Sequence, residues 1–415
     1  MKTSEKPRFY YPLIIFVLTL LLAPGAVSSA MAESQAENFK ITAMSRNLYL
    51  GADIFKVVEA AQENPDSIPD VVADVYQTML FTNFWARAEA IADEIATHKP
   101  IVIGLQEVST FYIQTPGDFI IGNPTKANDV VIDFYEVLND ALLDRGIEYE
   151  AFTVTNADVE LPMADFDAGE PYYLSDVRMV DRDMLLVKKG YDAELLFADN
   201  YSNNLSLDLG GVNVEFTRGF LIVDVDMEGQ IFRFVNTHLE VRGAVDSVFR
   251  LIQDFQMQEL KGLLALYSLD PKPIVMIGDF NSSPEDVPGF GYHPALERSI
   301  PYVPPYMQAV EAGYLDTWLL QKKKHDEGYT SGFDEYVSDP TAELTSRIDL
   351  IFVDPKDMFV VKTKCEVVGN DVSDMIPNPI DPDTLMLWPS DHAGVVAEIQ
   401  FLKMPPQSRG KPGVQ

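Results

Sequence analysis

Short apolar runs, bordered by Gly, Pro or polar residues, recur along this chain. Such runs are typical of β-strands, which are buried where the run is continuous and half-buried where apolar and polar residues alternate. We predict strands at residues 39–45, 101–105, 149–155, 184–188, 219–226, 231–236, 273–277, 348–353 and 394–402. A Glu228-Gly229 turn joins two of these strands as a hairpin.

Apolar residues at helical spacing predict helices between the strands. The clearest helix covers residues 84–95, where one face is apolar and the opposite face carries Arg87 and Glu94 among other charged residues. Further helices are predicted around residues 57–61, 130–143 and 253–266. Pro65 and Pro69 interrupt the pattern after the first of these.

Strands separated by only a few helices, with hairpins among them, favour two β-sheets packed face to face with helices outside. Residues 156–176, 285–314 and 371–383 are rich in acidic, aromatic, Pro or Gly residues, and we predict that they form long loops. The sequence contains no internal repeat and no break in composition that would mark a domain boundary.

The first 32 residues have the pattern of a cleaved signal peptide. Three basic residues within the first eight precede an apolar stretch at 13–22, which is too short to span a bilayer comfortably. Ala-Met-Ala at residues 30–32 then provides a cleavage site between small residues. An uncleaved N-terminal anchor is the alternative. We therefore expect a secreted or periplasmic protein.

The remainder is predicted to form one domain at residues 33–404, followed by a disordered tail at 405–415 that is rich in Pro and Gly. The composition, with 47% hydrophobic and 23% charged residues, is typical of a globular protein. Because Cys365 is the single cysteine, no disulfide can form within the chain. Its stability must therefore come from the core or from a bound metal.

The net charge of −33 limits the partners that this protein can bind. A strongly acidic surface repels phosphate backbones, so non-specific binding of duplex nucleic acid through basic patches is disfavoured. A bound divalent cation would still reverse the sign of the charge at one site.

Asp279 and Asn281 follow the buried run at residues 273–277 and open a loop rich in Ser and Pro. In an extended backbone, side chains two residues apart point the same way. A carboxylate and an amide held together in this manner could activate a nucleophile and bind an oxyanion. The alternative is a polar turn in which these side chains bind their own backbone.

Polar residues recur at the ends of the other predicted strands as well. They are Asn47, Glu107, His238, Asp349, Asp391 and His392. Loops at strand ends of a rigid scaffold commonly carry catalytic and binding residues. We therefore expect these side chains to meet at one site.

Six short motifs resemble those of the endonuclease/exonuclease/phosphatase superfamily, in the order found in that family. They are Ser45-Arg46-Asn47, Gly104-Leu105-Gln106-Glu107-Val108, Asn236-Thr237-His238-Leu239, Gly278-Asp279-Phe280-Asn281, Ser346-Arg347-Ile348-Asp349 and Ser390-Asp391-His392. The superfamily includes pancreatic-type deoxyribonucleases, abasic-site endonucleases, neutral sphingomyelinases and inositol-polyphosphate 5-phosphatases. The resemblance spans residues 39–402. It implies a four-layered α/β sandwich that hydrolyses a phosphate ester with Mg²⁺ or Mn²⁺.

The resemblance also implies which residues hold the metal. Glu107 resembles the metal-binding glutamate of the family, Asn47 would help to hold the metal or its water, and Asp391 would be the second carboxylate. Mg²⁺ prefers oxygen ligands, and one or two carboxylates together with a substrate phosphate are sufficient.

The catalytic roles follow from the same resemblance. Asp279 resembles the base that orients and deprotonates the attacking water, while Asn281 and His238 would stabilise the phosphoryl oxygens. His392 would bind the phosphate, and Asp349 would fix the tautomer of its ring. Which histidine protonates the leaving group is left open.

Other residues have weaker support. Arg218 stands where related nucleases carry an arginine that contacts phosphate, although a structural salt bridge explains it equally well. Asp183, or its neighbour Asp181, could orient His238. Tyr49 occupies a position where nuclease relatives often place an Asp or Gln near the metal, so a further ligand there is in doubt.

We expect the substrate to be a phosphodiester: a nucleic acid, a phospholipid head group or a small diester. Acidic loops beside the predicted site argue against long nucleic acids, and no stable nucleic-acid partner is expected. Their aromatic residues could seat a lipid or a nucleobase, or could simply pack over the sheet edge. The alternatives are an extracellular nuclease acting on DNA or RNA, and a catalytically silent binding protein with the same fold.

Overall fold

The first of two large β-sheets has eight strands. The computed structural model describes residues 36–405, with gaps at 165–173, 210–211, 245–246 and 323–326. The sheet has the order β17-β20-β1-β2-β6-β3-β4, and β5 also pairs with β6. Its strands are β1 (Glu37–Asn47), β2 (Val102–Gln106), β3 (Thr110–Gln114), β4 (Asp129–Asp133), β5 (Tyr149–Ala164), β6 (Leu174–Lys188), β17 (Met358–Val368) and β20 (Gly394–Lys403). Only the pairing of β1 with β2 is parallel.

The second sheet has six strands in the order β15-β16-β12-β11-β10-β7. They are β7 (Ala193–Asn200), β10 (Gly219–Met227), β11 (Gln230–His238), β12 (Ile274–Asp279), β15 (Leu315–Asp316) and β16 (Asp349–Asp354). Here β11 and β12 form the parallel pair, and the other pairings are antiparallel. Both sheets are therefore mixed.

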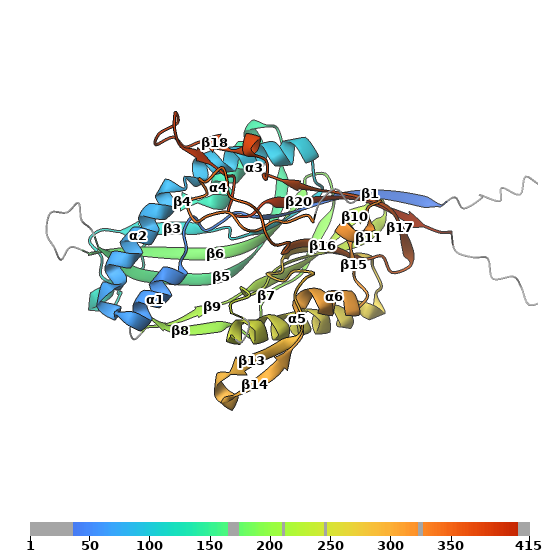
Figure 1. The fold of residues 1–415 in the computed structure, drawn as a ribbon. Coiled ribbons are helices and arrows are strands. Elements are labelled where there is room, and N and C mark those ends of the chain that lie inside the picture. Colours follow the sequence, from blue (N-terminus) through green and yellow to red (C-terminus); the bar gives the residue numbers. More distant parts are fainter. Residues whose placement is uncertain (1–35, 165–173, 210–211, 245–246, 323–326, 406–415) are drawn as a thin grey trace, which may run out of the picture. The chain divides into compact units, whose positions relative to one another are not determined.

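Helices cover the outer faces of the two sheets (Figure 1). They are α1 (Phe55–Glu63), α2 (Ile68–Phe81), α3 (Phe84–His98), α4 (Phe134–Asp144), α5 (Val248–Leu266), α6 (Pro305–Glu311) and α7 (Thr317–Leu320). The first four lie on the first sheet, and α5 and α6 lie on the second. Three small hairpins complete the chain: β8 (Leu205–Leu209) with β9 (Val212–Phe216), β13 (Gly289–His293) with β14 (Arg298–Tyr302), and β18 (Ile376–Pro377) with β19 (Met386–Leu387).

Alternation along the strands explains the layers. Successive side chains of a strand point to opposite faces, so Ala43 packs between the sheets while Met44 packs under the helices. Phe234 and Val275 of the second sheet meet the first sheet in the same central layer. The predicted four-layered sandwich of two packed mixed sheets flanked by helices is confirmed.

Every predicted strand overlaps an observed strand, but the predicted loop at residues 156–176 is wrong. Most of that stretch belongs to the long hairpin of β5 and β6, which stay paired as far as Ala164 and Leu174. Polar residues are stable in this hairpin because they pair across it. Arg178 donates to Asp158 over a distance of 2.8 Å.

Several other helices and strands were not predicted, because proline and polar residues obscure their sequence patterns. Pro69 lies in the first turn of α2, where its missing N–H is not needed, so it begins a helix rather than only interrupting one. The predicted helix at 130–143 begins four residues later, at Phe134, after β4 and with Asp133 as its N-cap. The predicted loop at 285–314 contains the β13–β14 hairpin and α6.

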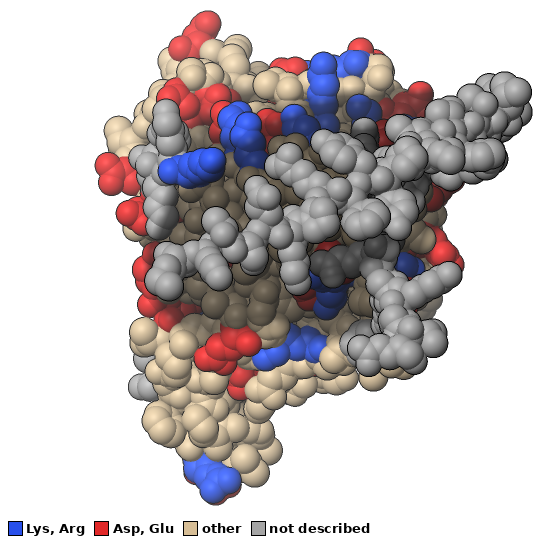
Figure 2. All heavy atoms as spheres, turned by 90° about the vertical axis from the view of Figure 1, so that its right-hand side faces the viewer, with Lys and Arg blue, Asp and Glu red and all other residues tan. Residues whose placement is uncertain are grey.

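The described residues belong to one compact unit. The predicted signal peptide and nearly all of the predicted tail lie outside the described residues. Among the helices that the structure describes, none is both long and apolar enough to span a membrane. On the face drawn in Figure 2, acidic side chains are spread around the margin and a small group of Lys and Arg side chains lies in the upper part.

Candidate active site

The strand pairings bring the predicted site residues to one edge of the two sheets. In the first sheet, Asn47 and Gln106 are register partners at the ends of the parallel strands β1 and β2. In the second sheet, Asp279 is the register partner of both His238 and Asp349. Parallel strands that end together deliver their next residues to the same edge.

Asn47 connects the two sheets at this edge. Its Nδ2 donates to Glu107 Oε1 over 3.1 Å and to Asp279 Oδ2 over 3.3 Å. Its Oδ1 accepts from the backbone N–H of Tyr49 over 2.8 Å. In this conformation Asn47 therefore presents its amide nitrogen to the carboxylates, and its role as a metal ligand stays a prediction.

Glu107 lies directly after β2 and is held from both oxygens. Besides the contact with Asn47, its Oε2 accepts from the backbone N–H of Leu50 over 2.8 Å. Burial, followed by the nearby charges of Asp391 and Asp181, raises the pKa of Glu107 to about 8. A carboxylate in such surroundings gains stability in its charged form when a cation is near.

Asp279 lies at the end of β12 and is almost completely buried, with 1% of its surface exposed. Its Oδ1 accepts from the backbone N–H of Asn281 over 2.8 Å. Burial, followed by the charge of Asp349, raises the pKa of Asp279 above its usual value. A carboxylate with a raised pKa is a better proton acceptor, which suits a general base.

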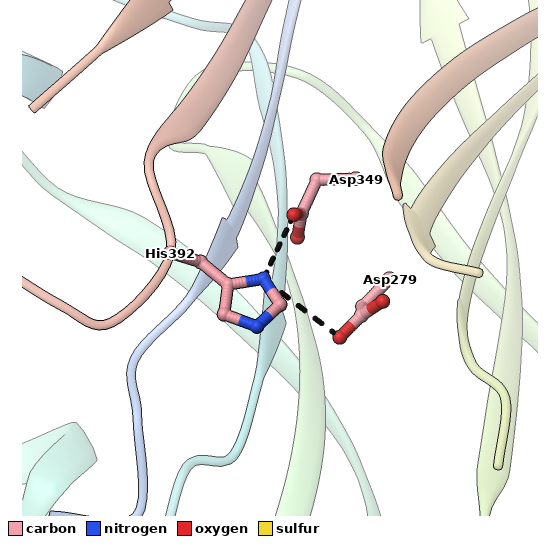
Figure 3. Close-up of side chains that lie close together, drawn as sticks. All are labelled: Asp279, Asp349 and His392. Carbon is pink, nitrogen blue, oxygen red and sulfur yellow. Dashed lines mark hydrogen bonds and ion pairs between the residues drawn. The ribbon is translucent and has the colours of Figure 1, made fainter. Parts of the chain in front are cut away.

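The ring of His392 faces two carboxylates, those of Asp349 and Asp279 (Figure 3). Its Nδ1 is 2.8 Å from Asp349 Oδ2 and 4.0 Å from Asp279 Oδ2. Burial alone would lower the pKa of His392, but the charges of Asp349, Asp391 and Asp279 raise it well above the usual value. The carboxylates around the ring therefore favour its protonated form.

His238 has the opposite protonation state. Burial, followed by the charge of Arg218, lowers its pKa to about 4, so the ring is neutral at pH 7. Arg218 Nη1 lies 3.1 Å from Nε2 and 3.2 Å from Nδ1 of this ring, and Nη2 forms an ion pair with Glu240 at 3.3 Å. Arg218 thus has a salt-bridge partner and also lines the cleft, and its contact with a phosphate stays a prediction. His238 Nδ1 also lies 3.5 Å from Asp183 Oδ1, as proposed for the orienting carboxylate.

Asn281 and Asp391, the remaining predicted site residues, also lie at this edge of the sheets. Asn281 donates its amide to the backbone carbonyl of Leu239 over 3.0 Å, beside the end of β11. Asp391 accepts from Ser390 Oγ over 3.3 Å and is half-buried, and desolvation raises its pKa. Asp391 and Glu107 line one cleft, together with Asp181 and Arg218. Of the predicted site residues, none lies away from this edge.

Backbone strain accompanies the site. Tyr49, Glu107 and Asn281 have φ angles of 63°, 59° and 46°, in the left-handed region that side chains other than glycine rarely adopt. Non-glycine residues in such conformations cluster at functional sites, where the surrounding structure holds them in place.

Arg87 is a site residue that the pattern of the helix concealed. We predicted it on the solvent face of α3, but it is completely buried. Its guanidinium donates to the carbonyls of Leu48 at 2.7 Å, Tyr49 at 3.3 Å and Pro389 at 3.1 Å, and so joins the loop after β1 to the loop before β20. Burial lowers the pKa of Arg87 to about 10. Helical periodicity shows which face of a helix is polar, but not that loops cover that face.

The donors at this edge fit a divalent cation. Glu107 and Asp391 are half-buried carboxylates whose pKa values are raised chiefly by desolvation, and hard divalent cations prefer such oxygens. Asp279, Asp349 and His392 also offer ligand atoms that all lie within 4.8 Å of one another. Asp279, Asp349 and His392 are therefore a second group of donors, besides the cleft carboxylates, that could hold a cation.

The fold is thus a sandwich of two mixed sheets with buried acids and histidines at one edge. The family model described as "Endonuclease/Exonuclease/phosphatase family" matches residues 82–392. The chain belongs to the endonuclease/exonuclease/phosphatase family, whose members hydrolyse phosphoric esters and use divalent metals. The predicted resemblance is thereby confirmed.

Solved structures are similar to this chain over most of its length. One is an endonuclease/exonuclease/phosphatase family protein from Bacteroides thetaiotaomicron, with a TM-score of 0.50 and 15% identity over 89% of this chain and 100% of that chain. Others are the mannosyl-6-phosphatase Bt3783 of Bacteroides thetaiotaomicron (TM-score 0.47, 16% identity, 86% and 99% covered) and truncated TDP2 of Caenorhabditis elegans (0.45, 16%, 87% and 97%). A search of curated proteins found no match. At these identities the first structure supports the fold alone.

Proposed function

We propose that this protein is an exported phosphodiesterase that depends on Mg²⁺ or Mn²⁺. The observation that carries the proposal is the position of Asp279. It is linked through Asn47 to Glu107 on one side, and it faces the Asp349–His392 pair on the other. A buried base thus lies between a set of carboxylates suited to a metal and a protonated imidazole.

Glu107 and Asp391, with Asn47, would hold the metal. The bound ion would supply positive charge to the phosphoryl oxygens. Asn47 would offer its Oδ1 to the ion or to a water on it, after releasing the N–H of Tyr49 that this oxygen now accepts. The cluster of Asp279, Asp349 and His392 fits a metal less well, because Nδ1 of His392 is already bonded to Asp349 Oδ2 at 2.8 Å.

Side chains of the protein would carry out the proton transfer and stabilise the phosphoryl oxygens. Asp279 would take a proton from the attacking water, because its raised pKa favours protonation as the bond to phosphorus forms. His392 and Arg218 would donate hydrogen bonds to the phosphoryl oxygens as negative charge grows there. His238 would accept from Arg218 and keep it directed toward the site.

The charge of the site favours a diester over a monoester. Four acids lie at this site, Glu107, Asp181, Asp279 and Asp391, and when they are ionised they repel a dianion more strongly than a monoanion. A phosphodiester carries a single negative charge, whereas a phosphomonoester carries up to two at pH 7. Export rests on the signal-peptide pattern of residues 1–32.

Hydrolysis of bis-p-nitrophenyl phosphate tests this proposal. We expect release of p-nitrophenol with Mg²⁺, loss of the activity in EDTA, and recovery when the metal is restored. Asp279→Asn should lower kcat by a factor of about 10² to 10⁴, because general-base catalysis is lost. Asp140→Asn, at an exposed position of α4, is the matched control and should retain full activity.

Three results would contradict the proposal. Activity that persists unchanged in EDTA would exclude the metal, and near-normal turnover by a folded Asp279→Asn variant would exclude the base. If the purified protein hydrolyses none of this diester, DNA, RNA and sphingomyelin, the proposal that it is a phosphodiesterase is excluded.

A further inference from the structure

An apolar slot lies between the helices α1 and α2 and the strands β3, β5 and β6 of the first sheet. Twelve side chains line the slot, and Tyr76 is the only one of them with a polar group. The others include Val75 of α2 and Val159 of β5, which are both partly exposed. A recess of this kind offers water almost no hydrogen-bonding groups.

The slot is continuous with the catalytic cleft. Ile54, Met179 and Phe216 line both the slot and the cleft that contains Glu107 and Asp391. A molecule bound at the metal-binding carboxylates could therefore extend into the slot past these three side chains.

We infer that the slot binds the hydrocarbon chain of an amphiphilic phosphodiester substrate. The inference rests on the proposed function and adds the class of substrate to it. Burial of a methylene group contributes about 0.8 kcal/mol, so an aliphatic chain in such a slot gains affinity with each carbon. A phosphoryl group in the cleft, beside Arg218, would supply the polar end of the same molecule.

A nucleobase fits this slot poorly. Its ring edges carry several hydrogen-bond donors and acceptors, and the lining offers them only the hydroxyl of Tyr76. Polar groups that lose water without finding partners cost about 1–3 kcal/mol each. A hydrocarbon chain has no such groups, so the lining discriminates in its favour.

The chain-length dependence of hydrolysis tests the inference. The substrates are methyl, butyl and octyl 4-nitrophenyl phosphate, each used below its micelle-forming concentration. We expect kcat/KM to rise with chain length, at most about fourfold per methylene, which is the factor that corresponds to the burial of one such group.

A variant that fills the slot separates chain binding from the chemistry. Val159→Trp should flatten the dependence on chain length and leave hydrolysis of the methyl ester within about twofold of wild type. Val130→Trp is the matched control, because it adds the same group at a position of β4 that is 61% exposed and outside the slot. Thermal unfolding verifies that both variants are folded, and Val75→Trp replaces Val159→Trp if the latter is not.

A binding measurement gives the second readout, which does not depend on turnover. With Mg²⁺ present, calorimetry compares octylphosphonate with methylphosphonate, neither of which has an ester bond to cleave. We expect tighter binding of the octyl compound by wild type and by Val130→Trp, and loss of that advantage in Val159→Trp.

The outcomes distinguish the two proposals. Diester hydrolysis without any chain-length preference, together with equal binding of both phosphonates, would contradict the inference that the slot binds a hydrocarbon chain. It would not contradict the proposed function. If none of the esters is hydrolysed, the proposed function is contradicted. The comparison of the two phosphonates then tests by itself whether the slot binds a hydrocarbon chain. A chain-length preference that Val159→Trp leaves unchanged would also contradict chain binding in the slot.

Discussion

His392 shows how the surroundings of one side chain set its chemistry. Two histidines lie within reach of Asp279, yet the pKa of one is raised and that of the other is lowered. The difference comes from the neighbours. Burial opposes the charge on both rings, but carboxylates surround His392, whereas the guanidinium of Arg218 contacts His238.

Replacement of Asp349 by Asn tests this arrangement. Without the carboxylate, the pKa of His392 should fall, and the alkaline limb of the kcat/KM profile should move to lower pH by about one to two units. Rates measured from about pH 5.5 to 9.5 check the prediction, with Asp357→Asn at an exposed position as the control. Identical profiles for wild type and Asp349→Asn would show that this carboxylate does not hold the proton on His392.

The same shift has a consequence for stability. Because the pKa of His392 in the folded state is raised above its unfolded value of 6.5, the protonated ring stabilises the fold fully below that pH. This stabilisation is lost as the pH rises through the folded-state pKa. In Asp349→Asn that part of the pH dependence should be reduced.

At the scale of elements, Arg87 of α3 holds two site loops in place. It supports the loops that carry Tyr49 and Asp391, because its guanidinium donates to carbonyls in or next to both of them. The stacked guanidinium also lies 5.0 Å from the ring centroid of Phe84. The helix thus holds in place the loops beside the side chains proposed to bind the metal.

Arg87→Met should therefore lower both stability and metal affinity. Loss of the donors leaves several buried carbonyls unsatisfied, for which we expect about 3 kcal/mol of lost unfolding free energy. Urea unfolding measures the first effect, and the Mg²⁺ concentration for half-maximal activity, which should rise, measures the second.

Arg145→Met is the matched control for that experiment. Arg145, which follows α4, forms ion pairs with Glu89 and Asp93 of α3. The side chains of these two acids are 56% and 73% exposed. Exposed pairs contribute at most about 1 kcal/mol, so this variant should change little. A normal metal requirement in a folded Arg87→Met protein would show that the contacts of Arg87 are structural only.

At the scale of the whole molecule, the net charge of −33 makes a bound cation a source of stability. We expect Mg²⁺ to raise the midpoint of thermal unfolding, because a ligand at one hundred times its Kd adds about 2.7 kcal/mol to the folded state. EDTA should reverse the shift, and Glu107→Gln should abolish most of it.

Two controls separate specific binding from general screening. NaCl at the same ionic strength shows how much of the shift comes from weaker repulsion among the acidic groups. Glu150→Gln, at an exposed position of β5, removes one negative charge far from the carboxylates of the cleft and should keep the response to Mg²⁺. Equal shifts with Mg²⁺ and NaCl would exclude a specific metal site at Glu107.

The sequence by itself determined the nine predicted strands, though not others such as β7 and β17, and it determined the identities of the residues at the strand ends and the family to which the chain belongs. These features depend on local alternation and on short motifs, which survive without knowledge of the fold. The hairpin of β5 and β6 was not evident, because its polar residues are satisfied only by partners on the opposite strand.

Only the tertiary structure decided how the site residues are used. Two parallel strand pairs in different sheets bring Glu107 and Asp279 to the same amide of Asn47. Covering loops bury Arg87, which by its spacing belongs to a solvent-facing surface. The apolar slot likewise forms where two helices meet a sheet. Burial and neighbouring charge act through space between segments distant in sequence, so no local pattern records them.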